Sequence, residues 1–305
     1  MGKIAFVFPG QGTQYSGMGL DLFRGSPAAC KIFHLADQIR PGTSSQCFSG
    51  SDEDLAQTHI AQPCLFAVEL AAAAAAVEAG ISPSAVAGFS LGEIAALTFS
   101  GAVSFEEGFK MVCLRGELMR DDAEKCDASM VAVLKLDAGT VEHLCSLYKY
   151  VYPVNYNCPG QISVSGERAE LEDFIKSVKA AGGRAVPLRV GGGFHSPFMA
   201  SAAVRFGEAL KDVCFCSPKI PLYSNYTASL YADDFISSLS MQICSPVRWR
   251  DIVTDMIQNG FDTFIELGPG KTLCGFIERT DSSVRVLNVE DCESLIRTLE
   301  EAARC

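Results

Sequence analysis

Apolar and polar residues recur along the chain with two different periods, which separates predicted strands from predicted helices. The run Lys3 to Phe8 is mostly apolar and breaks at Pro9-Gly10-Gln11-Gly12. This predicts a buried parallel strand followed by a loop. Residues 85–89 and 263–267 form two further short apolar runs. Helical patterns lie between them, so strands and helices alternate, as in an α/β fold.

The helices predicted outside the middle of the chain have apolar residues at helical spacing or a high alanine content. They cover residues 28–39, 63–79, 92–97, 105–119, 199–211 and 249–259, with one more after residue 271. Residues 41–45 are predicted as a loop, and so is most of the Ser- and Pro-rich stretch after residue 211. Within that stretch, the alternation of Cys214-Phe215-Cys216 is more typical of a strand than of a zinc site.

The pattern changes after Asp121, where shorter elements begin. Strands are predicted at residues 130–136, within 154–164 on both sides of a Pro-Gly turn, and at 184–190, with helices at 140–148 and 169–181. The order β-α-β-β-α-β is that of a ferredoxin-like domain. We therefore predict a large, doubly wound, α/β-hydrolase-like domain of residues 1–124 and 194–305. A small ferredoxin-like α+β domain of residues 125–193 is predicted to be inserted into it.

Composition and charge narrow the class of protein. The chain has 305 residues, 48% of them hydrophobic, which suits a globular protein with a substantial core. Its net charge of -11 argues against nucleic acid as a partner. The N-terminal apolar run is too short for a signal peptide, and the apolar stretch 65–77 is interrupted by Glu69 and too short to span a bilayer. These features predict a soluble, cytoplasmic protein without a membrane partner.

The cysteines do not form a recognisable framework. There are 13, an odd number, and none belongs to a C-x-x-C pair. We expect reduced thiols, without disulfides and without a metal site.

Ser90 lies in the sequence Gly88-Phe89-Ser90-Leu91-Gly92, which fits the pattern G-x-S-x-G. A short apolar run precedes this pattern and a predicted helix follows it. Such a strand-turn-helix exposes the serine hydroxyl, and the next backbone N–H faces the oxyanion of an acyl-transfer reaction. Ser90 is therefore the candidate nucleophile.

A serine hydroxyl needs a general base, and the chain has four histidines. His34 and His143 lie in predicted helices and His59 near a Gln-Pro turn, whereas His195 follows three glycines and Phe194, where the predicted insertion ends. A hydrolase triad runs Ser, Asp or Glu, then His near the chain end. More than a hundred residues follow His195, and no acidic partner stands out. A Ser-His dyad steadied by a backbone carbonyl fits better.

Two phosphate-binding motifs are incomplete. Gly270-Lys271-Thr272 ends like a phosphate-binding loop, but Ile265 stands where that motif needs its first glycine. Gly10-Gln11-Gly12 is followed by Tyr15, where a dinucleotide fingerprint needs a small residue. No nucleotide redox cofactor is implied.

Seven segments resemble those of the malonyl-CoA:acyl carrier protein transacylases, and they occur in the family's order over almost the whole chain. They are residues 8–12, 88–93, 115–119, 153–161, 194–196, 246–249 and 266–271. The resemblance implies that Ser90 and His195 are catalytic. It also implies that the backbone N–H groups of Gln11 and Leu91 form the oxyanion hole, and that Arg115 holds the malonyl carboxylate.

The resemblance implies further roles around the dyad. The main-chain carbonyl of Gln242 would orient His195, and Asn157 would lie beside the substrate. The family usually has histidine where this chain has Phe89. Phe194 resembles an aromatic residue that accompanies malonyl preference in related polyketide acyltransferases, so we hypothesise malonyl over methylmalonyl.

The implied reaction is a ping-pong transfer from coenzyme A thioesters to acyl carrier protein, without metal or other cofactor, in fatty acid synthesis. Carrier proteins are acidic, so docking needs a local basic patch, for which the candidates are Lys176, Lys179, Arg184 and Arg189. Three alternatives remain: a stand-alone polyketide synthase acyltransferase, a serine thioesterase or lipase, and a non-catalytic carrier-protein-binding module.

Overall fold

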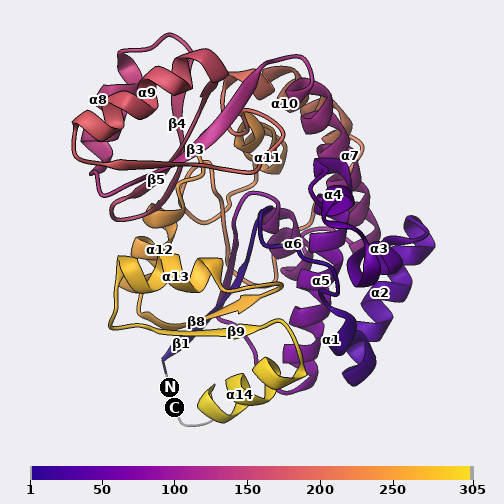
Figure 1. Ribbon diagram of the computed structural model, residues 1–305. Coiled ribbons are helices and arrows are strands. Elements are labelled where there is room, and N and C mark those ends of the chain that lie inside the picture. The colour runs from indigo at the N-terminus through magenta and orange to yellow at the C-terminus, as the bar shows by residue number, and fades with distance from the viewer. Residues whose placement is uncertain (1, 303–305) are drawn as a thin grey trace.

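A computed structural model describes residues 2–302, and it contains two separate β-sheets (Figure 1). The larger sheet has the order β7-β2-β1-β8-β9, and every neighbouring pair is parallel. Its strands are β1 Lys3–Phe8, β2 Ala85–Gly88, β7 Leu222–Tyr223, β8 Phe261–Leu267 and β9 Arg285–Val289.

The helices outside the small sheet come between and after these strands. They are α1 Leu20–Gly25, α2 Pro27–Ile39, α3 Thr43–Ser49, α4 Asp52–Leu55, α5 Thr58–Glu78, α6 Gly92–Phe99, α7 Phe105–Ala123, the 3-10 turn η1 Pro197–Met199, α10 Ala200–Leu210, α11 Phe235–Cys244, α12 Trp249–Gln258, α13 Thr272–Thr280 and α14 Cys292–Ala302.

Helices cover both faces of the larger sheet. On β1, Phe6 and Phe8 pack into a core with residues of α5 and α6, while Ala5 and Val7 pack against α12 and α13. All four side chains are fully buried. Because both faces of β1 are covered, its sequence is continuously apolar rather than alternating.

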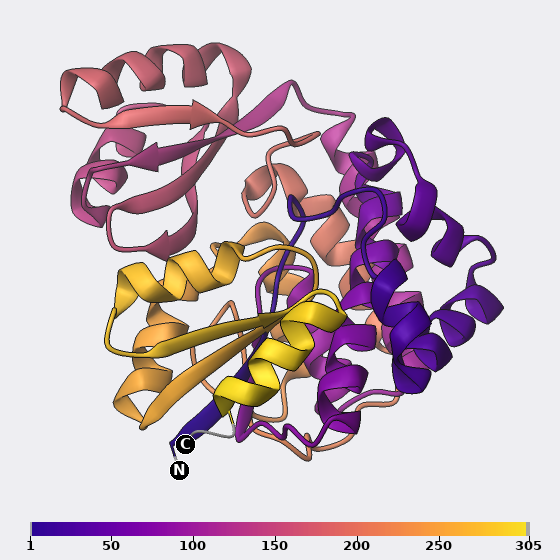
Figure 2. The same ribbon diagram turned by 60° about the horizontal axis from the view of Figure 1, so that its bottom comes forward.

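The smaller sheet is antiparallel and has the order β4-β5-β3-β6. Its elements are β3 Ala128–Leu134, α8 Ala138–Ser146, β4 Val151–Cys158, β5 Gln161–Glu167, α9 Arg168–Ala180 and β6 Arg184–Pro187. The predicted order of strands and helices is therefore present. Figure 2 shows this sheet and its helices as a unit beside the larger sheet, with α12 and α13 against β4. The domain limits 125–193 stay a prediction.

The order of the larger sheet reverses at β1. From β1 the chain passes to β2 on one side, whereas β8 and β9 lie on the other. At such a point the loops at the carboxyl ends of the strands diverge and leave a crevice in which ligands bind. The loop after β1 carries Gln11, and the turn after β2 carries Ser90. The topology thus brings two distant candidate residues to one edge.

Two segments predicted as loops are helices. Helix α3 begins at Thr43, and Asp37 of α2 accepts a hydrogen bond from its Ser44 N–H. Helix α11 was not predicted because its sequence is rich in serine. The Ser240 hydroxyl donates to a backbone carbonyl of its own helix, while the apolar residues at i, i+4 and i+8 are buried, namely Phe235, Leu239 and Ile243. Tertiary packing overrides the local composition in both places.

The strand predicted at Cys214-Phe215-Cys216 is wrong. This segment belongs to no strand. The Cys216 N–H donates to the carbonyl of Ala102, and the Cys214 N–H donates to Glu107. The backbone groups therefore bond to the region around the start of α7 instead of to a sheet.

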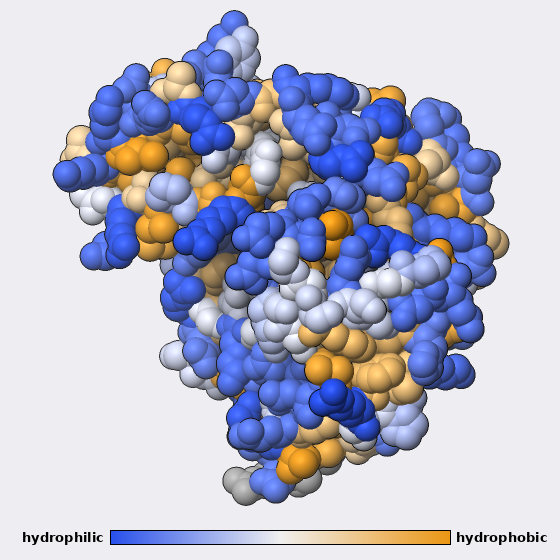
Figure 3. Space-filling view, turned by 45° about the vertical axis from the view of Figure 1, so that its right-hand side comes forward, coloured by the Kyte–Doolittle hydropathy of each residue, from blue (hydrophilic) through white to orange (hydrophobic). Residues whose placement is uncertain are grey.

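Helix α5 begins at Thr58, five residues before the predicted start, so that His59 and Pro63 both lie inside it. Of the described helices it is the one that is long and apolar enough to cross a membrane, but 89% of its most apolar window is buried inside the molecule. It packs against α2 and α7. On the face that Figure 3 shows, hydrophilic residues cover much of the surface and hydrophobic residues lie in smaller groups. The predicted cytoplasmic location stays a prediction.

Glu69 lies in the middle of α5 and is fully buried. Neither of its carboxylate oxygens has a hydrogen-bond partner in the protein. Burial, together with the nearby Glu266, raises its pKa well above the ordinary value. Burial likewise raises the pKa of Glu266 to about 7, although its Oε2 accepts a 2.8 Å hydrogen bond from the Cys274 N–H. The core thus contains two carboxyl groups whose ionisation opposes folding.

The raised pKa of Glu69 predicts that this residue destabilises the fold more as the pH rises. A carboxyl group whose pKa is raised on folding stabilises the fold fully below its unfolded pKa, near 4.5, and loses that contribution as the pH rises. We expect Glu69→Gln to melt about 2–4 °C above the wild type at about pH 8, and to differ less at about pH 5. Differential scanning calorimetry measures both. Glu172→Gln, on an exposed position of α9, is the control and leaves the melting temperature unchanged. Equal melting temperatures of Glu69→Gln and wild type at about pH 8 would contradict this account.

Candidate functional site

Ser90 lies on a tight turn between β2 and α6, with a left-handed φ of 56°. Two glycines make the turn possible. A Cβ on Gly88 would lie 1.9 Å from the backbone of Gly92, and a Cβ on Gly92 would lie 2.2 Å from the Phe8 carbonyl oxygen. The G-x-S-x-G pattern is therefore required by the close approach of β1, β2 and α6. This geometry holds the serine at the carboxyl edge of the sheet.

His195 lies beside Ser90 although 105 residues separate them in the chain. The Ser90 Oγ is 2.7 Å from the His195 Nε2. The His195 Nδ1 is 2.8 Å from the backbone oxygen of Gln242, so Nδ1–H donates to this carbonyl and Nε2 can accept the serine proton. In the described part of the chain, no carboxylate accepts a hydrogen bond from His195. The Ser90 hydroxyl, the His195 imidazole and the Gln242 carbonyl thus form one hydrogen-bonded row, and the catalytic roles of Ser90 and His195 stay a prediction.

Arg115, on α7, reaches the same point and is only 1% exposed. Its NH1 donates to Gln62 Oε1 at 2.9 Å, and its NH2 donates to Gln242 Oε1 at 2.8 Å and to Ser90 Oγ at 3.2 Å. The acceptors are neutral oxygens, and the Nε has no partner in the protein. A buried guanidinium beside the candidate nucleophile is suited to bind a carboxylate of a substrate.

The buried charge affects the candidate base. Burial and, secondly, the positive charge of Arg115 lower the pKa of His195 to about 3. Burial lowers the pKa of Arg115 itself to about 10, and the negative charge of Glu93 opposes this. His195 is consequently neutral at physiological pH and can accept a proton, while Arg115 remains charged.

The sequence did not predict the buried hydrogen-bonded group formed by Glu93, Asn225 and Tyr231 near the serine. Glu93 is fully buried on α6, and burial raises its pKa to about 7. Its carboxylate accepts hydrogen bonds from Tyr231, the Asn225 N–H and the Gln242 side chain. Glu93 could have been noted in the sequence as the residue directly after the glycine of the motif. No local signal marks Asn225 or Tyr231, which lie in the segment predicted as a loop.

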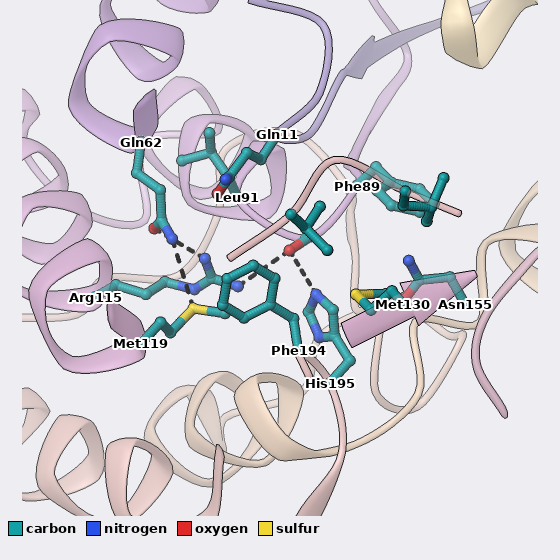
Figure 4. A pocket seen from close by; sticks show the side chains of 13 residues that line it. Gln11, Gln62, Phe89, Leu91, Arg115, Met119, Met130, Asn155, Phe194 and His195 are labelled. Carbon is teal, nitrogen blue, oxygen red and sulfur yellow. Dashed lines mark hydrogen bonds between the residues drawn. The ribbon is translucent and has the colours of Figure 1, made fainter. Parts of the chain in front are cut away.

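Ser90 lines a cavity of about 80 Å³, and Figure 4 shows the side chains around that cavity. Gln11 and Leu91 both line it, as do Phe194, Met119 and Asn155. In the described part of the chain, neither the Gln11 N–H nor the Leu91 N–H donates to another protein group. These N–H groups are available to donate to an oxyanion.

Asn157 does not line this cavity. It lines a neighbouring pocket of about 280 Å³ that shares Gln11, Phe89, Asn155 and Leu188 with the first one. Its Nδ2 donates to Ser163 at 3.2 Å, and its buried Oδ1 has no partner in the protein. Asn155, two residues earlier on β4, is the asparagine that faces both pockets. Sequence reasoning did not single it out.

Phe89 has an aromatic environment. Its ring centroid lies 5.7 Å from that of Trp249 and 6.2 Å from that of Phe276. An aromatic side chain at this position therefore packs against α12 and α13, and the contacts of Ser90 with His195 do not involve it.

The four basic candidates for partner docking are exposed. Lys176 and Lys179 lie on α9, Arg184 on β6 and Arg189 in the segment that follows β6. Lys176 forms a 2.8 Å ion pair with Asp173. Within residues 2–302, no group of three or more His, Cys, Asp or Glu side chains could hold a metal ion.

The acyl transferase domain family matches residues 5–301. The malonyl CoA-acyl carrier protein transacylase of Bacillus subtilis (strain 168) is 37% identical over 312 residues, with 99% of this chain and 98% of the relative covered. The crystal structure of the malonyl CoA-acyl carrier protein transacylase from Clostridium perfringens superposes with a TM-score of 0.95, at 35% identity and with 99% and 98% coverage of this chain and of that chain. A solved complex of a type II PKS acyl-carrier protein with its malonyl-transacylase contains a chain that matches with a TM-score of 0.94, at 32% identity and with 98% and 99% coverage.

The lowered pKa of His195 can be tested directly. We expect its ring resonances, assigned with a His195→Gln variant, to show no titration between about pH 8 and about pH 5, because the buried imidazole stays neutral. Arg115→Ala removes the neighbouring charge and should raise the pKa. Two-dimensional NMR of histidine-labelled protein measures both. A wild-type midpoint near the ordinary 6.5 would contradict the assignment.

Proposed function

The chain belongs to the acyl transferase domain family and, within it, to the malonyl-CoA–acyl carrier protein transacylases. From this premise, we propose that it transfers malonyl from malonyl-CoA to the phosphopantetheine thiol of acyl carrier protein through a malonyl-Ser90 intermediate. The observation that carries the proposal is the buried Arg115 guanidinium, whose NH2 lies 3.2 Å from the Ser90 Oγ. One cavity thus contains both a group suited to bind a carboxylate and the proposed nucleophilic serine.

In the first half of the reaction, His195 accepts the Ser90 proton as the Oγ attacks the thioester carbonyl. The 2.7 Å contact between Oγ and Nε2 supports this transfer. The N–H groups of Gln11 and Leu91 would stabilise the oxyanion. The carbon–sulfur bond then breaks, and His195 returns its proton to the leaving coenzyme A sulfur. Malonyl-Ser90 and the free thiol result.

In the second half, the carrier protein's thiol enters the place that coenzyme A has left. His195 accepts the thiol proton while the sulfur attacks the Ser90 ester. The ester bond breaks, Ser90 recovers the proton from His195, and malonyl leaves on the carrier. Neither half requires a metal or a redox cofactor. The two thioesters bind in turn, which makes the cycle ping-pong.

Arg115 would select the acid that the acyl group carries. Its guanidinium is held by the side-chain oxygens of Gln62 and Gln242, which fix its plane without neutralising it. A malonyl carboxylate can accept two parallel N–H bonds from such a group. An acetyl group offers no acceptor there, so it leaves the charge buried and uncompensated.

The neighbouring pocket is suited to the thioester arm. It shares lining residues with the Ser90 cavity. Its lining includes the polar residues Thr13, Asn157, Ser163 and Thr272. The amide groups of a pantetheine chain need such donors and acceptors. Asn157 would then contact the arm rather than the malonyl group, and its Oδ1, unpaired in the protein, would accept from an amide N–H.

We propose the finer fold description on the same basis. The order β4-β5-β3-β6 supports a ferredoxin-like insertion of residues 125–193 in an α/β-hydrolase-like domain. Exposed Lys176, Lys179, Arg184 and Arg189 are the candidate docking surface for an acidic carrier.

Fatty acid synthesis is the proposed setting. The likeness to the complex with a type II PKS acyl-carrier protein favours a second candidate, a stand-alone polyketide synthase acyltransferase with the same chemistry. Transfer of malonyl from malonyl-CoA to purified carrier proteins of both kinds, with acetyl- and methylmalonyl-CoA as controls, tests the proposal. Absence of transfer to any carrier would overturn it.

Two substitutions test the role of Ser90 as nucleophile and the role of Arg115 in binding the carboxylate. We expect Ser90→Ala to abolish the acyl-enzyme, because no other group takes up the acyl chain. Arg115→Ala should lower kcat/KM for malonyl-CoA by about a hundred-fold or more and shift preference to acetyl-CoA, because one buried charge pair is lost. Steady-state kinetics with both thioesters measure the shift. An Arg115→Ala enzyme that keeps its malonyl preference would refute the proposal that Arg115 binds the malonyl carboxylate.

Phe194 is predicted to limit the size of the acyl group. It is 6% exposed and lines the Ser90 cavity, where an extra methyl group would meet its ring. We expect wild type to prefer malonyl over methylmalonyl, and Phe194→Ser to raise the relative rate for methylmalonyl about ten-fold or more. Competition between the two thioesters measures this ratio. Comparable turnover of both by the wild type would disprove the hypothesis.

A further inference from the structure

The side chain of Asn225 bridges the two sides of the turn that carries Ser90. Its Oδ1 accepts the Ser90 N–H at 2.7 Å, and its Nδ2 donates to the Gly88 carbonyl at 2.6 Å. Asn225 is fully buried and lies 135 residues from Ser90 in the chain. One amide therefore satisfies the backbone groups on both sides of Phe89.

Asn225 is itself held by Glu93. Its backbone N–H donates to Glu93 Oε1 at 3.1 Å, and the Tyr231 hydroxyl donates to the same oxygen at 2.6 Å. The other carboxylate oxygen accepts from Gln242 Nε2 at 2.8 Å. That Gln242 nitrogen also donates to the Ser90 carbonyl at 2.6 Å. The N–H of Ser90 is thus linked through Asn225, and its C=O through Gln242, to a single buried carboxylate.

Such bonding is needed because the conformation of Ser90 is costly. A left-handed φ costs a residue other than glycine about 1–2 kcal/mol. The structure must therefore over-determine the turn if the hydroxyl is to stay 2.7 Å from His195. Hydrogen bonds on the Ser90 N–H and C=O provide this constraint without touching the hydroxyl.

We infer that Asn225 and Glu93 are positioning residues that hold Ser90 in its reactive conformation. The inference rests on the proposed function in taking Ser90 as the nucleophile. Neither side chain contacts the Ser90 Oγ or the Nε2 of His195, so both act through the backbone of the turn and through Gln242. Loss of either changes the reactivity of Ser90 without removing the dyad or the Arg115 guanidinium.

The test measures Ser90 reactivity independently of malonyl binding. A small alkyl fluorophosphonate is the probe: an oxygen–phosphorus bond forms at Ser90, the phosphorus–fluorine bond breaks, and the serine proton passes to His195. The probe has no carboxylate for Arg115 to bind and no thioester arm, so its reaction does not depend on malonyl recognition. Rates of labelling are followed by intact-mass spectrometry for wild type, Asn225→Ala, Asn225→Asp and Glu93→Gln, alongside kcat and KM for malonyl-CoA.

We expect labelling to slow about a hundred-fold in Asn225→Ala, since misplacing a reacting atom by about 1 Å has an effect of this size. Asn225→Asp keeps an acceptor for the Ser90 N–H but loses the donor to Gly88, so its rate should be intermediate. Glu93→Gln loses one acceptor and should slow labelling about ten-fold. In each variant kcat falls more than KM rises.

Asn288→Ala is the matched control, because Asn288 is also a buried asparagine but lies on β9, away from the cavity. Its labelling rate should equal that of the wild type. A merely structural role predicts fewer labelled molecules that react at the wild-type rate, and this result would overturn the inference. If Asn225→Ala does not fold, Asn225→Asp and Glu93→Gln decide in the same way. A wild type that labels at Ser90 but is not malonylated would instead refute the proposed function.

Discussion

The site depends on a buried guanidinium that is bonded to neutral oxygens. Arg115 is 1% exposed, and its partners are the amide oxygens of Gln62 and Gln242 and the hydroxyl of Ser90. Removing a charge from water costs several kcal/mol, and neutral acceptors offset only part of that cost. A buried charge of this kind is suited to bind a carboxylate. Burial is the main cause that disfavours a proton on His195, and the charge of Arg115 adds to it. In the proposed reaction, the same buried charge would both select the acid and contribute to keeping His195 neutral.

Gln242 connects this charge to the rest of the site. Its backbone oxygen accepts from His195, its Oε1 accepts from Arg115, and its Nε2 donates to the Ser90 carbonyl and to Glu93. Arg115, His195 and Ser90, the proposed carboxylate-binding group, base and nucleophile, are consequently all hydrogen-bonded to one residue.

The sequence predicted those features that local pattern determines. The strands around Ser90, the serine itself and the position of His195 follow from short apolar runs and glycines, and the family resemblance added Arg115 and the carbonyl of Gln242. The sequence pattern did not predict helix α11, because its composition is rich in serine, which is typical of loops, although the Ser240 hydroxyl bonds to its own helix. Asn225 and the unpaired Glu69 were missed because their importance comes from contacts with residues far away in the chain. Periodicity carries no information on such contacts.

The central claim is that Ser90 passes its acyl group to a thiol rather than to water. The most direct measurement is the intact mass of the protein after mixing with malonyl-CoA, first without an acceptor and then with acyl carrier protein. The account predicts one malonyl group on Ser90 that persists without acceptor and moves to the carrier when it is added. Immediate return to the unmodified mass, with free malonate accumulating, would identify a hydrolase and contradict the account.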